Sequence, residues 1–461
     1  MVLGLAFALS MNLVKTQNFV IIFADDLGYG DLSCYGNTRF KTPNLDRMAR
    51  NGVRFTDFNV ASPACSPSRA SILTGCYPAR VSVPQVLNPD SPTGLSLEET
   101  TIAQMLKPMG YATACVGKWH LGVKNLMPTY HGFDYYYGLP YSNDMWPPNG
   151  KGWPDLFLHE NTKPVEQVKT LDDQALLTQK YTHKAKEFIV RNKQKPFFLY
   201  MTPSMPHVPI AASKKFLGKS GKGLYADTIQ ELDASVGEIL DTLKKNGLEQ
   251  NTLVMFSSDN GPWLPYGEHA GSSGGLREGK GTAFEGGFRV PGIFYQPGTV
   301  PAGGVIRELA STMDVLPTIA SMAGAKLPDK EIDGHNIFDL ITDKPGSRTP
   351  WKWFYYYWPG ELHAVRSGKW KLHVPHNHRL QTQPPGIGGK PNGETTGEIG
   401  LALFDLDNDP FETTNVADQN PDVVARMLRM IEIGRSDFGD TLTKAKGSLV
   451  RPPGKIELQQ L

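Results

Sequence analysis

The sequence predicts an α/β sheet covered by helices, followed by a smaller α+β domain built on an antiparallel sheet. Three observations predict this fold. Apolar, β-branched runs alternate with amphipathic stretches, polar residues follow several of those runs, and the composition changes after residue 324 to a segment rich in Pro, Asp and Lys. With 461 residues and 40% hydrophobic residues, the chain is long enough for two domains, which we place at 18–333 and 334–461.

Strands and helices alternate in the first domain. We expect strands at Asn18–Ala24, Ala112–Val116, Phe197–Met201 and Leu253–Phe256, and helices at Pro43–Asn51, Leu97–Met109, Tyr225–Asn246 and Thr312–Gly324. The helix over Tyr225–Asn246 has the strongest pattern, because its apolar residues fall at helical spacing and Gly247 supplies a left-handed stop.

The second domain has the texture of a small antiparallel sheet. We expect strands at Trp353–Trp358 and Leu401–Leu406, a hairpin of Ala364–Arg366 and Lys369–Val374 turned at Ser367–Gly368, and a terminal helix at Pro421–Gly434. The segment His376–Gly400 is rich in Gly and Pro and predicts a long loop, either mobile or functional.

Charge and cysteine content exclude several classes of protein. The 47 basic and 46 acidic residues leave a net charge of +1, without the basic excess expected of a protein that binds nucleic acid or acidic membranes. Four cysteines in a chain of this length do not make a disulfide scaffold.

The N-terminus leaves two interpretations open. The apolar run Val2–Leu9 is far shorter than the roughly twenty residues of a membrane span. It is either the core of a signal segment over 1–17, with Ala8 and Ser10 placed for cleavage, or else a first helix or a mis-assigned start with Met11 as the rival start. We expect export. Because the chain has no Asn-x-Ser/Thr sequon, a bacterial periplasm or the extracellular space is the expected compartment.

Polar residues follow each predicted strand of the first domain. These are Asp25 and Asp26, then Lys118 and His120, then His207, then Asp259 and Asn260. In open α/β sheets the ligand crevice lies at the carboxyl ends of the strands, so these groups are expected to converge.

The carboxylates in this set indicate a cation site. Asp25 and Asp26 are adjacent like charges, which are costly after an apolar strand unless a cation neutralises them. The alternative is a turn in which one Asp caps a helix. With Asp259 and Asn260 the set offers only oxygen ligands, which suit Ca²⁺ or Mg²⁺ rather than zinc.

Cys65 lies in the run Ala64–Gly75. A lone cysteine is usually a small buried apolar residue. Here Arg69 follows four residues later, and a helix is expected to begin near Ser71–Leu73. A thiol close to a helix N-terminus and a fixed cation is placed where an anion would bind.

Two stretches resemble the signatures of the type I sulfatases, a family of the alkaline-phosphatase-like superfamily. They are Cys65-Ser66-Pro67-Ser68-Arg69 with Thr74-Gly75, and Gly110–His120. Further matches are Asp25-Asp26-Leu27-Gly28, Pro206-His207, Ser258–Gly261, Lys280 and Glu285–Pro291, so that the resemblance runs from about Asn18 to Asp418. Tyr141–Met145 is similar to the branch of arylsulfatase A and the N-acetylgalactosamine sulfatases.

The resemblance implies a mixed sheet sandwiched by helices and an enzyme that removes sulfate from a sulfated glycan or an aryl sulfate. It also implies that a formylglycine-generating or anaerobic sulfatase-maturating enzyme oxidises Cys65 to formylglycine, whose hydrated aldehyde attacks sulfur. Ca²⁺, in preference to Mg²⁺, is expected on Asp25, Asp26, Asp259, Asn260 and the formylglycine oxygen of residue 65.

The resemblance also implies roles for the remaining matched residues. Arg69 is expected to hold the diol, His120 to take its proton, and His207 to bind sulfate or protonate the leaving oxygen. The residues expected to bind sulfate oxygens are Lys118, Lys280 and Ser142.

The residues expected around the sugar are less tied to a motif. They are Asn143, Asp144, Trp146, Trp263, His269, His376 and Arg379, with the aromatic run at 351–358. That run is equally typical of a buried strand. A sulfated galactose or N-acetylgalactosamine is the expected substrate.

Two other functions remain open. One is a phosphodiesterase or phosphonate hydrolase of the same superfamily, and the other is a catalytically dead carbohydrate-binding relative. Two-metal phosphatases of this fold have an Asp-His pair where this chain has Asp259-Asn260, which argues for one metal. Every matched catalytic position is occupied, which argues against a dead enzyme.

Overall fold

The computed structural model describes residues 16–150, 152–382 and 384–457. The signal segment expected over 1–17 lies almost entirely outside these residues. No helix in the described ranges is long and apolar enough to cross a membrane.

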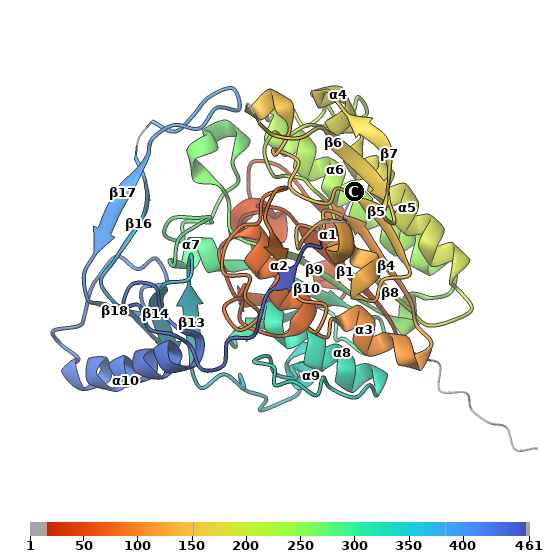
Figure 1. Cartoon of the computed structure of the whole chain (residues 1–461). Helices are drawn as coiled ribbons and strands as arrows, with labels where there is room; N and C mark the ends of the chain where they lie inside the picture. Colours follow the sequence, from red (N-terminus) through yellow and green to blue (C-terminus); the bar gives the residue numbers. More distant parts are fainter. Residues whose placement is uncertain (1–15, 151, 383, 458–461) are drawn as a thin grey trace, which may run out of the picture.

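A mixed sheet forms the larger part of the molecule (Figure 1). Its strands are β1 (Asn18–Ala24), β2 (Val53–Asn59), β4 (Ala112–Gly117), β5 (Tyr135–Gly138), β6 (Leu156–Glu160), β7 (Lys163–Val168), β8 (Phe197–Thr202), β9 (Thr252–Ser258), β10 (Arg289–Tyr295), β11 (Gly304–Ile306) and β12 (Ala310–Ser311). Their order is β11-β2-β10-β9-β1-β8-β4-β5-β6-β7, with β12 beside β2. Because β9, β1, β8, β4 and β5 are parallel while β10 runs antiparallel to β9, the expected mixed sheet is confirmed.

Helices cover both faces of this sheet. They are α1 (Pro43–Arg50), α2 (Cys65–Thr74), α3 (Ile102–Leu106), α4 (Leu171–Ala175), α5 (Leu177–Arg191), α6 (Leu224–Lys245), α7 (Glu285–Phe288), α8 (Val315–Ala323) and α9 (Phe338–Ile341). Alternate side chains of β1 enter two separate cores. Phe19 and Ile21 pack with residues of α2, α3 and α8, while Val20 and Ile22 pack with residues of α1, α5 and α6.

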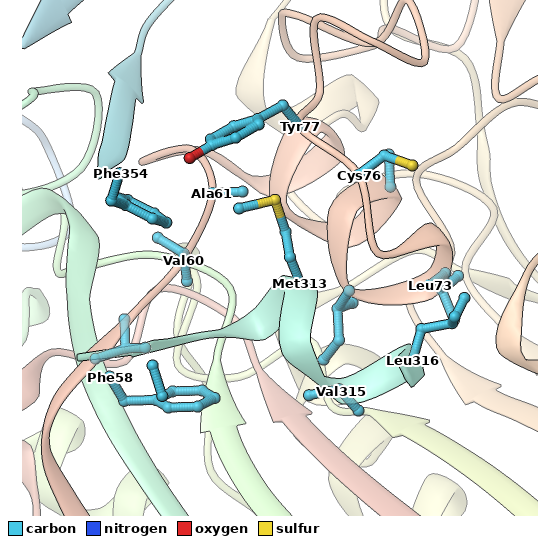
Figure 2. Close-up of a cluster of buried hydrophobic side chains, with 14 of the residues drawn as sticks. Phe58, Val60, Ala61, Leu73, Cys76, Tyr77, Met313, Val315, Leu316 and Phe354 are labelled. Carbon is cyan, nitrogen blue, oxygen red and sulfur yellow. The ribbon is translucent and has the colours of Figure 1, made fainter. Parts of the chain in front are cut away.

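A smaller antiparallel sheet follows. It consists of β13 (Phe354–Tyr357), β14 (Leu362–Ser367), β15 (Trp370–His373) and β18 (Ala402–Asp405), with α10 (Pro421–Phe438) packed on it. Figure 2 shows Phe354 of β13 in one apolar cluster with Leu73 of α2, Tyr77, Met313 and Leu316 of α8. The two sheets therefore share one continuous core on this side.

The chain end returns to the main body. β19 (Gly454–Lys455) pairs antiparallel with β3 (Thr93–Gly94), and Arg451 donates its backbone N–H to the Arg80 carbonyl. Gly94 has no room for a side chain, since a Cβ there would lie 2.4 Å from the Leu121 carbonyl oxygen. This C-terminal strap, residues 451–456, crosses the loop that leads to α3.

Three sequence-based expectations are corrected. The helix expected from Leu97 begins at Ile102 and ends in a 3₁₀ turn at Lys107–Met109, because Thr101 and Gln104 form a capping box at its start. The hairpin turns at Gly368–Lys369, one residue later than expected, since Ser367 still pairs with Trp370.

The third correction concerns the loop expected over His376–Gly400. Its ends form a two-stranded antiparallel ribbon, β16 (His376–Gln381) and β17 (Glu394–Ile399), drawn in blue at the left of Figure 1. The Gly- and Pro-rich composition belongs to the tip between these strands, where Gly386 and Asn392 donate backbone N–H groups to the Pro265 carbonyl.

Candidate active site

The expected convergence of strand ends is present in the structure. Asp25 and Asp26 follow β1, Asp259 and Asn260 follow the adjacent β9, and Lys118 follows β4. Asp259 lies directly against the end of β1, because its backbone N–H bonds the Ala24 carbonyl and its Oδ1 accepts the Asp26 N–H at 3.1 Å. Asp26 adopts a positive φ of 60°, which turns the chain sharply at the sheet edge.

Cys65 is the first residue of α2, so the helix begins six residues earlier than the sequence predicted. The residue is 2% exposed. Lys280 Nζ lies 3.4 Å from its Sγ, and Asp25 Oδ1 lies 3.6 Å from it. Burial raises the pKa of the Cys65 thiol, which keeps the sulfur protonated.

Three carboxylates and three basic side chains surround this sulfur in what we call the site network. It consists of Asp25, Asp26, Arg69, Lys118, Asp259 and Lys280. Lys118 Nζ bonds Asp25 Oδ2 at 2.7 Å, and Lys280 Nζ lies 2.8 Å from Asp26 Oδ1. Arg69 binds Asp259 Oδ2 through Nε at 3.0 Å and Nη2 at 2.7 Å. Burial opposes ionisation of Asp25, but Lys118, His207 and Arg69 outweigh it and hold the pKa of Asp25 well below its usual range.

Only some of the oxygen ligands expected for a cation lie close together. Asp25, Asp26, Cys65 and His207 each place one potential ligand atom within 4.8 Å of the others. Asp259 stands outside that group and is held by Arg69. Asn260 donates its amide to Asp26 Oδ1 at 2.7 Å, while its own Oδ1 is buried without a hydrogen-bond partner among the described residues. A buried acceptor without a donor beside two carboxylates is a fitting ligand for a hard cation.

His120 is held in one tautomer. Its Nε2 lies 2.7 Å from the Leu87 carbonyl oxygen, which can only accept, so Nε2 carries the hydrogen. Nδ1 is therefore the basic nitrogen, and it is buried without a partner in the described part of the chain. Burial, with the positive charges of Lys118 and Arg69, holds the pKa of His120 well below its usual range. This imidazole is neutral and able to accept a proton.

His207 lies beside the carboxylates under an aromatic wall. Its Nδ1 is 2.6 Å from the Val208 carbonyl oxygen and its Nε2 is 3.6 Å from Asp26 Oδ2. The Trp263 ring packs on His207 at 5.7 Å, and Lys280 Nζ lies 4.4 Å from the centre of the same ring. The indole thereby orders a histidine and a lysine together.

A cavity of about 220 Å³ opens above these groups. Its walls consist of Ala64, Cys65, Val86, His120, Ser142, Asp144, Met145, His207, Trp263, Lys280, Gly281, Trp358 and Arg379. Of the predicted catalytic residues, Cys65, His120, His207 and Lys280 therefore line one cavity, and Arg69 binds Asp259 and the Lys118 carbonyl. Lys118 Nζ donates to Ser142 Oγ at 3.1 Å, which brings the lysine to the cavity wall.

Several expected sugar-binding residues lie elsewhere. The Asn143 amide donates to Gln174 Oε1 at 2.9 Å, and His376 stacks on His363 with ring centres 3.8 Å apart. Neither lines the cavity. Trp146 is buried, and residues 354–357 form the buried strand β13, so of the aromatic run at 351–358 only Trp358 lines the cavity.

The sequence missed some cavity residues. Val86 and Met145 line the wall, and the Leu87 carbonyl fixes the His120 tautomer, yet nothing in a loop more than thirty residues before His120 signals this. Gly281 had a weak signal, since it flanks Lys280 together with Gly279.

A family profile described as "Sulfatase" matches residues 17–325. A second profile, "C-terminal region of aryl-sulfatase", matches residues 349–453. Arylsulfatase A of Bos taurus is 39% identical over 468 residues, covering 96% of this chain and 92% of the relative. N-acetylgalactosamine-6-sulfatase of Canis lupus familiaris is 39% identical, covering 78% of this chain and 72% of the relative.

A solved structure has the same fold. The PsFucS1 sulfatase from Pseudoalteromonas sp. aligns with a TM-score of 0.83 at 25% identity, covering 95% of this chain and 92% of that one.

Proposed function

The chain belongs to the sulfatase family and is a sulfatase, an enzyme that hydrolyses sulfate esters, and we propose that it works through an oxidised Cys65 and one calcium ion. The observation that carries this proposal is the placement of Cys65, at the start of α2 and beneath the cavity, between Lys280 and Asp25.

A thiolate mechanism fits these surroundings poorly. The Cys65 thiol is buried and its pKa is raised, so the unmodified side chain is a weak nucleophile. Conversion of residue 65 to formylglycine by a formylglycine-generating or anaerobic sulfatase-maturating enzyme would supply a hydrated aldehyde, one hydroxyl of which attacks the ester sulfur.

The residues for calcium are Asp25, Asp26, Asp259 and Asn260, with the oxygen of the modified residue 65. Three carboxylates and the unpartnered Asn260 Oδ1 support a hard divalent cation, for which we favour Ca²⁺ over Mg²⁺. When bound, the ion would polarise oxygen and offset the charge of the carboxylates.

The other residues divide the remaining work. Arg69, Lys118, Lys280 and Ser142 hold negative oxygens in a preorganised field. The neutral His120 takes a proton at Nδ1, and its Nε2–H stays bonded to Leu87. His207, aligned by Val208 and covered by Trp263, is placed to bind sulfate or to protonate the departing alcohol oxygen.

The proposed substrate is a sulfated glycan or an aryl sulfate, with sulfated galactose or N-acetylgalactosamine as the sugar. The likeness to an N-acetylgalactosamine-6-sulfatase and a cavity of about 220 Å³, of a size for a single sugar ring, support it. Asp144, Trp263 and Arg379 are the proposed contacts to the sugar, and export to a periplasm or the medium is the proposed location.

Mass spectrometry of the Cys65 peptide, combined with kinetics, tests the mechanism. After coexpression with a formylglycine-generating enzyme we expect the mass of formylglycine at residue 65, and about a 10⁴-fold or larger loss of kcat/KM in Cys65→Ala. Cys115→Ala is the matched control, because this cysteine is also buried but lies in β4 away from the cavity. An unmodified thiol in a fully active enzyme would refute the mechanism.

The superfamily alternative is tested with matched aryl sulfate and aryl phosphate diester substrates. We expect sulfate to be cleaved faster, and activity removed by a chelator to return with Ca²⁺. Faster turnover of the diester would favour the phosphodiesterase, and full activity in the chelator would exclude the calcium site.

A further inference from the structure

Arg379 is the cationic side chain of the cavity wall that the proposed chemistry does not use. It reaches the cavity from β16, the strand expected to be part of a loop. The other lysine or arginine in the wall, Lys280, already forms an ion pair with Asp26, with 2.8 Å between its Nζ and a carboxylate oxygen. In the described part of the chain the Arg379 guanidinium donates no hydrogen bond, and its nearest ion pair is Glu394 at 3.7 Å.

The backbone opposite Arg379 is shaped to accommodate it. Gly281 has a φ of 78°, and a Cβ at this position would lie 3.0 Å from Arg379 Nε and 3.2 Å from its Cζ. A side chain at residue 281 would push the guanidinium away. Since Gly281 directly follows Lys280, Arg379 lies close to the lysine proposed to hold the scissile sulfate.

Two carboxylates lie near Arg379. A second, smaller hollow of about 10 Å³ is lined by Arg379 together with Glu278 and Glu394. The guanidinium, which is always charged, thus borders both hollows and lies 3.7 Å from Glu394.

The cavity lining also contains a carboxylate. Asp144 lines the cavity, and its Oδ1 is buried without a hydrogen-bond partner among the described residues. A carboxylate repels an anion and accepts hydrogen bonds from hydroxyl or amide groups. The lining therefore offers Asp144 to uncharged sugar groups and Arg379 to an anion.

From this arrangement we propose that the substrate carries a second anionic group beside the scissile sulfate and that Arg379 selects for it. This inference rests on the proposed sulfatase chemistry at Cys65 and adds the substrate class, a multiply anionic glycan. A guanidinium binds a sulfate or a carboxylate through paired N–H donors, so the second group is either another sulfate ester or a uronate.

Selectivity is measured as a ratio of kcat/KM values. The substrates are a monosulfated galactoside, the same sugar with a second sulfate, and the monosulfated sugar linked to a uronate; an aryl sulfate reports the basic chemistry. We expect the wild type to prefer a doubly anionic substrate, and Arg379→Ala to reduce that preference about ten- to a hundredfold, mainly through KM. Arg379→Lys should restore part of it, because the charge remains while the paired donors are lost.

Arg47→Ala is the control. Arg47 is also 40% exposed and also forms an ion pair, with Asp241, but it lies on α1 outside the cavity. It should keep the wild-type preference. The preferred substrate, either the disulfated sugar or the sugar linked to a uronate, identifies the second group as sulfate or carboxylate.

The possible outcomes separate the proposed role of Arg379 from the proposed sulfatase chemistry. Equal kcat/KM on singly and doubly anionic substrates, or a preference that survives Arg379→Ala, overturns the inference while leaving the sulfatase proposal intact. Absence of hydrolysis on every arm, aryl sulfate included, overturns both.

Discussion

Two buried charge networks in this protein contain equal numbers of acidic and basic side chains but have different consequences. The site network has three carboxylates and three basic side chains, and so does a second set that we call the junction network, formed by Asp57, Glu285, Arg289, Arg366, Lys371 and Glu412. The junction network links α7 to the C-terminal sheet, since Lys371 of β15 bonds both Glu285 and Glu412.

The networks differ in what lies beside them. In the junction network both oxygens of each carboxylate have donors; for example, Glu285 Oε1 accepts from Tyr356 and Lys371, and Glu412 Oε2 accepts a backbone N–H. Each network also has neighbours with an unpartnered buried atom among the residues described: Asn260 Oδ1 and His120 Nδ1 beside the site network, Asn59 Oδ1 and His373 Nδ1 beside the junction network. Neither the number of charges nor such atoms therefore distinguishes a structural network from a functional one, whereas the cavity that borders the site network does.

Of the changes that we predict, Lys371→Met should have the largest effect, a loss of stability, because it breaks the junction network. It leaves Glu285 and Glu412 buried with too little positive charge, so we expect the free energy of unfolding to fall by about 3–5 kcal/mol. Denaturant unfolding measures this, and kcat per folded molecule should stay at the wild-type value. The control is Lys369→Ala, whose ion pair with Asp405 is partly exposed and should cost about 0.5 kcal/mol or less.

Lys280→Met should produce the opposite pattern, a large loss of activity with a smaller loss of stability. We expect kcat/KM on an aryl sulfate to fall about 10²- to 10³-fold, since a preorganised positive charge is lost. Stability should fall less than in Lys371→Met, because Asp26 keeps the Asn260 amide at 2.7 Å. Activity within about threefold of wild type, or a stability loss equal to that of Lys371→Met, would show that the two networks are alike.

The smallest expected effect is a pH dependence of the folding stability, caused by His376 next to the junction network. Burial lowers the pKa of His376 to about 4, and this ring lies among His363, His373, His378 and the charge of Lys371. Between pH 6.5 and 4 the unfolded chain binds a proton that the folded protein does not, so stability falls as pH falls through this window. The loss from His376 is up to about 3 kcal/mol.

Melting temperature measured against pH checks this, and His376→Phe should flatten the curve below pH 6.5. A stability that is constant between pH 6.5 and 4 in the wild type would contradict the expectation.

Local patterns predicted the parts of the fold in which burial is periodic. The strands at Asn18–Ala24 and Phe197–Met201 and the helix at Tyr225–Asn246 are confirmed within a residue or two, and the polar groups after the strands meet as expected. The ribbon of β16 and β17 escaped prediction because its strands are short and half exposed, and its Gly- and Pro-rich tip dominates the composition.

The site was predictable through motif residues and only in part through their neighbours. Cys65, Lys118 and His207 follow from their motifs, whereas the Leu87 carbonyl beneath His120 and the cavity side chain of Val86 depend on long-range packing that no local pattern contains. Long-range packing also explains why His376 does not line the cavity as expected. Its ring stacks on His363 and His373 instead.

The C-terminal strap has a consequence for biosynthesis. β3 and β19 are separated by about 360 residues, so at a translation rate of about 5–20 residues per second the pairing forms roughly 20–70 s after Gly94 is made. Cys65 is 2% exposed in the folded protein, so the oxidation that we propose requires a maturating enzyme to act before folding is complete. The interval before the ribosome releases the last strand would be available for that reaction.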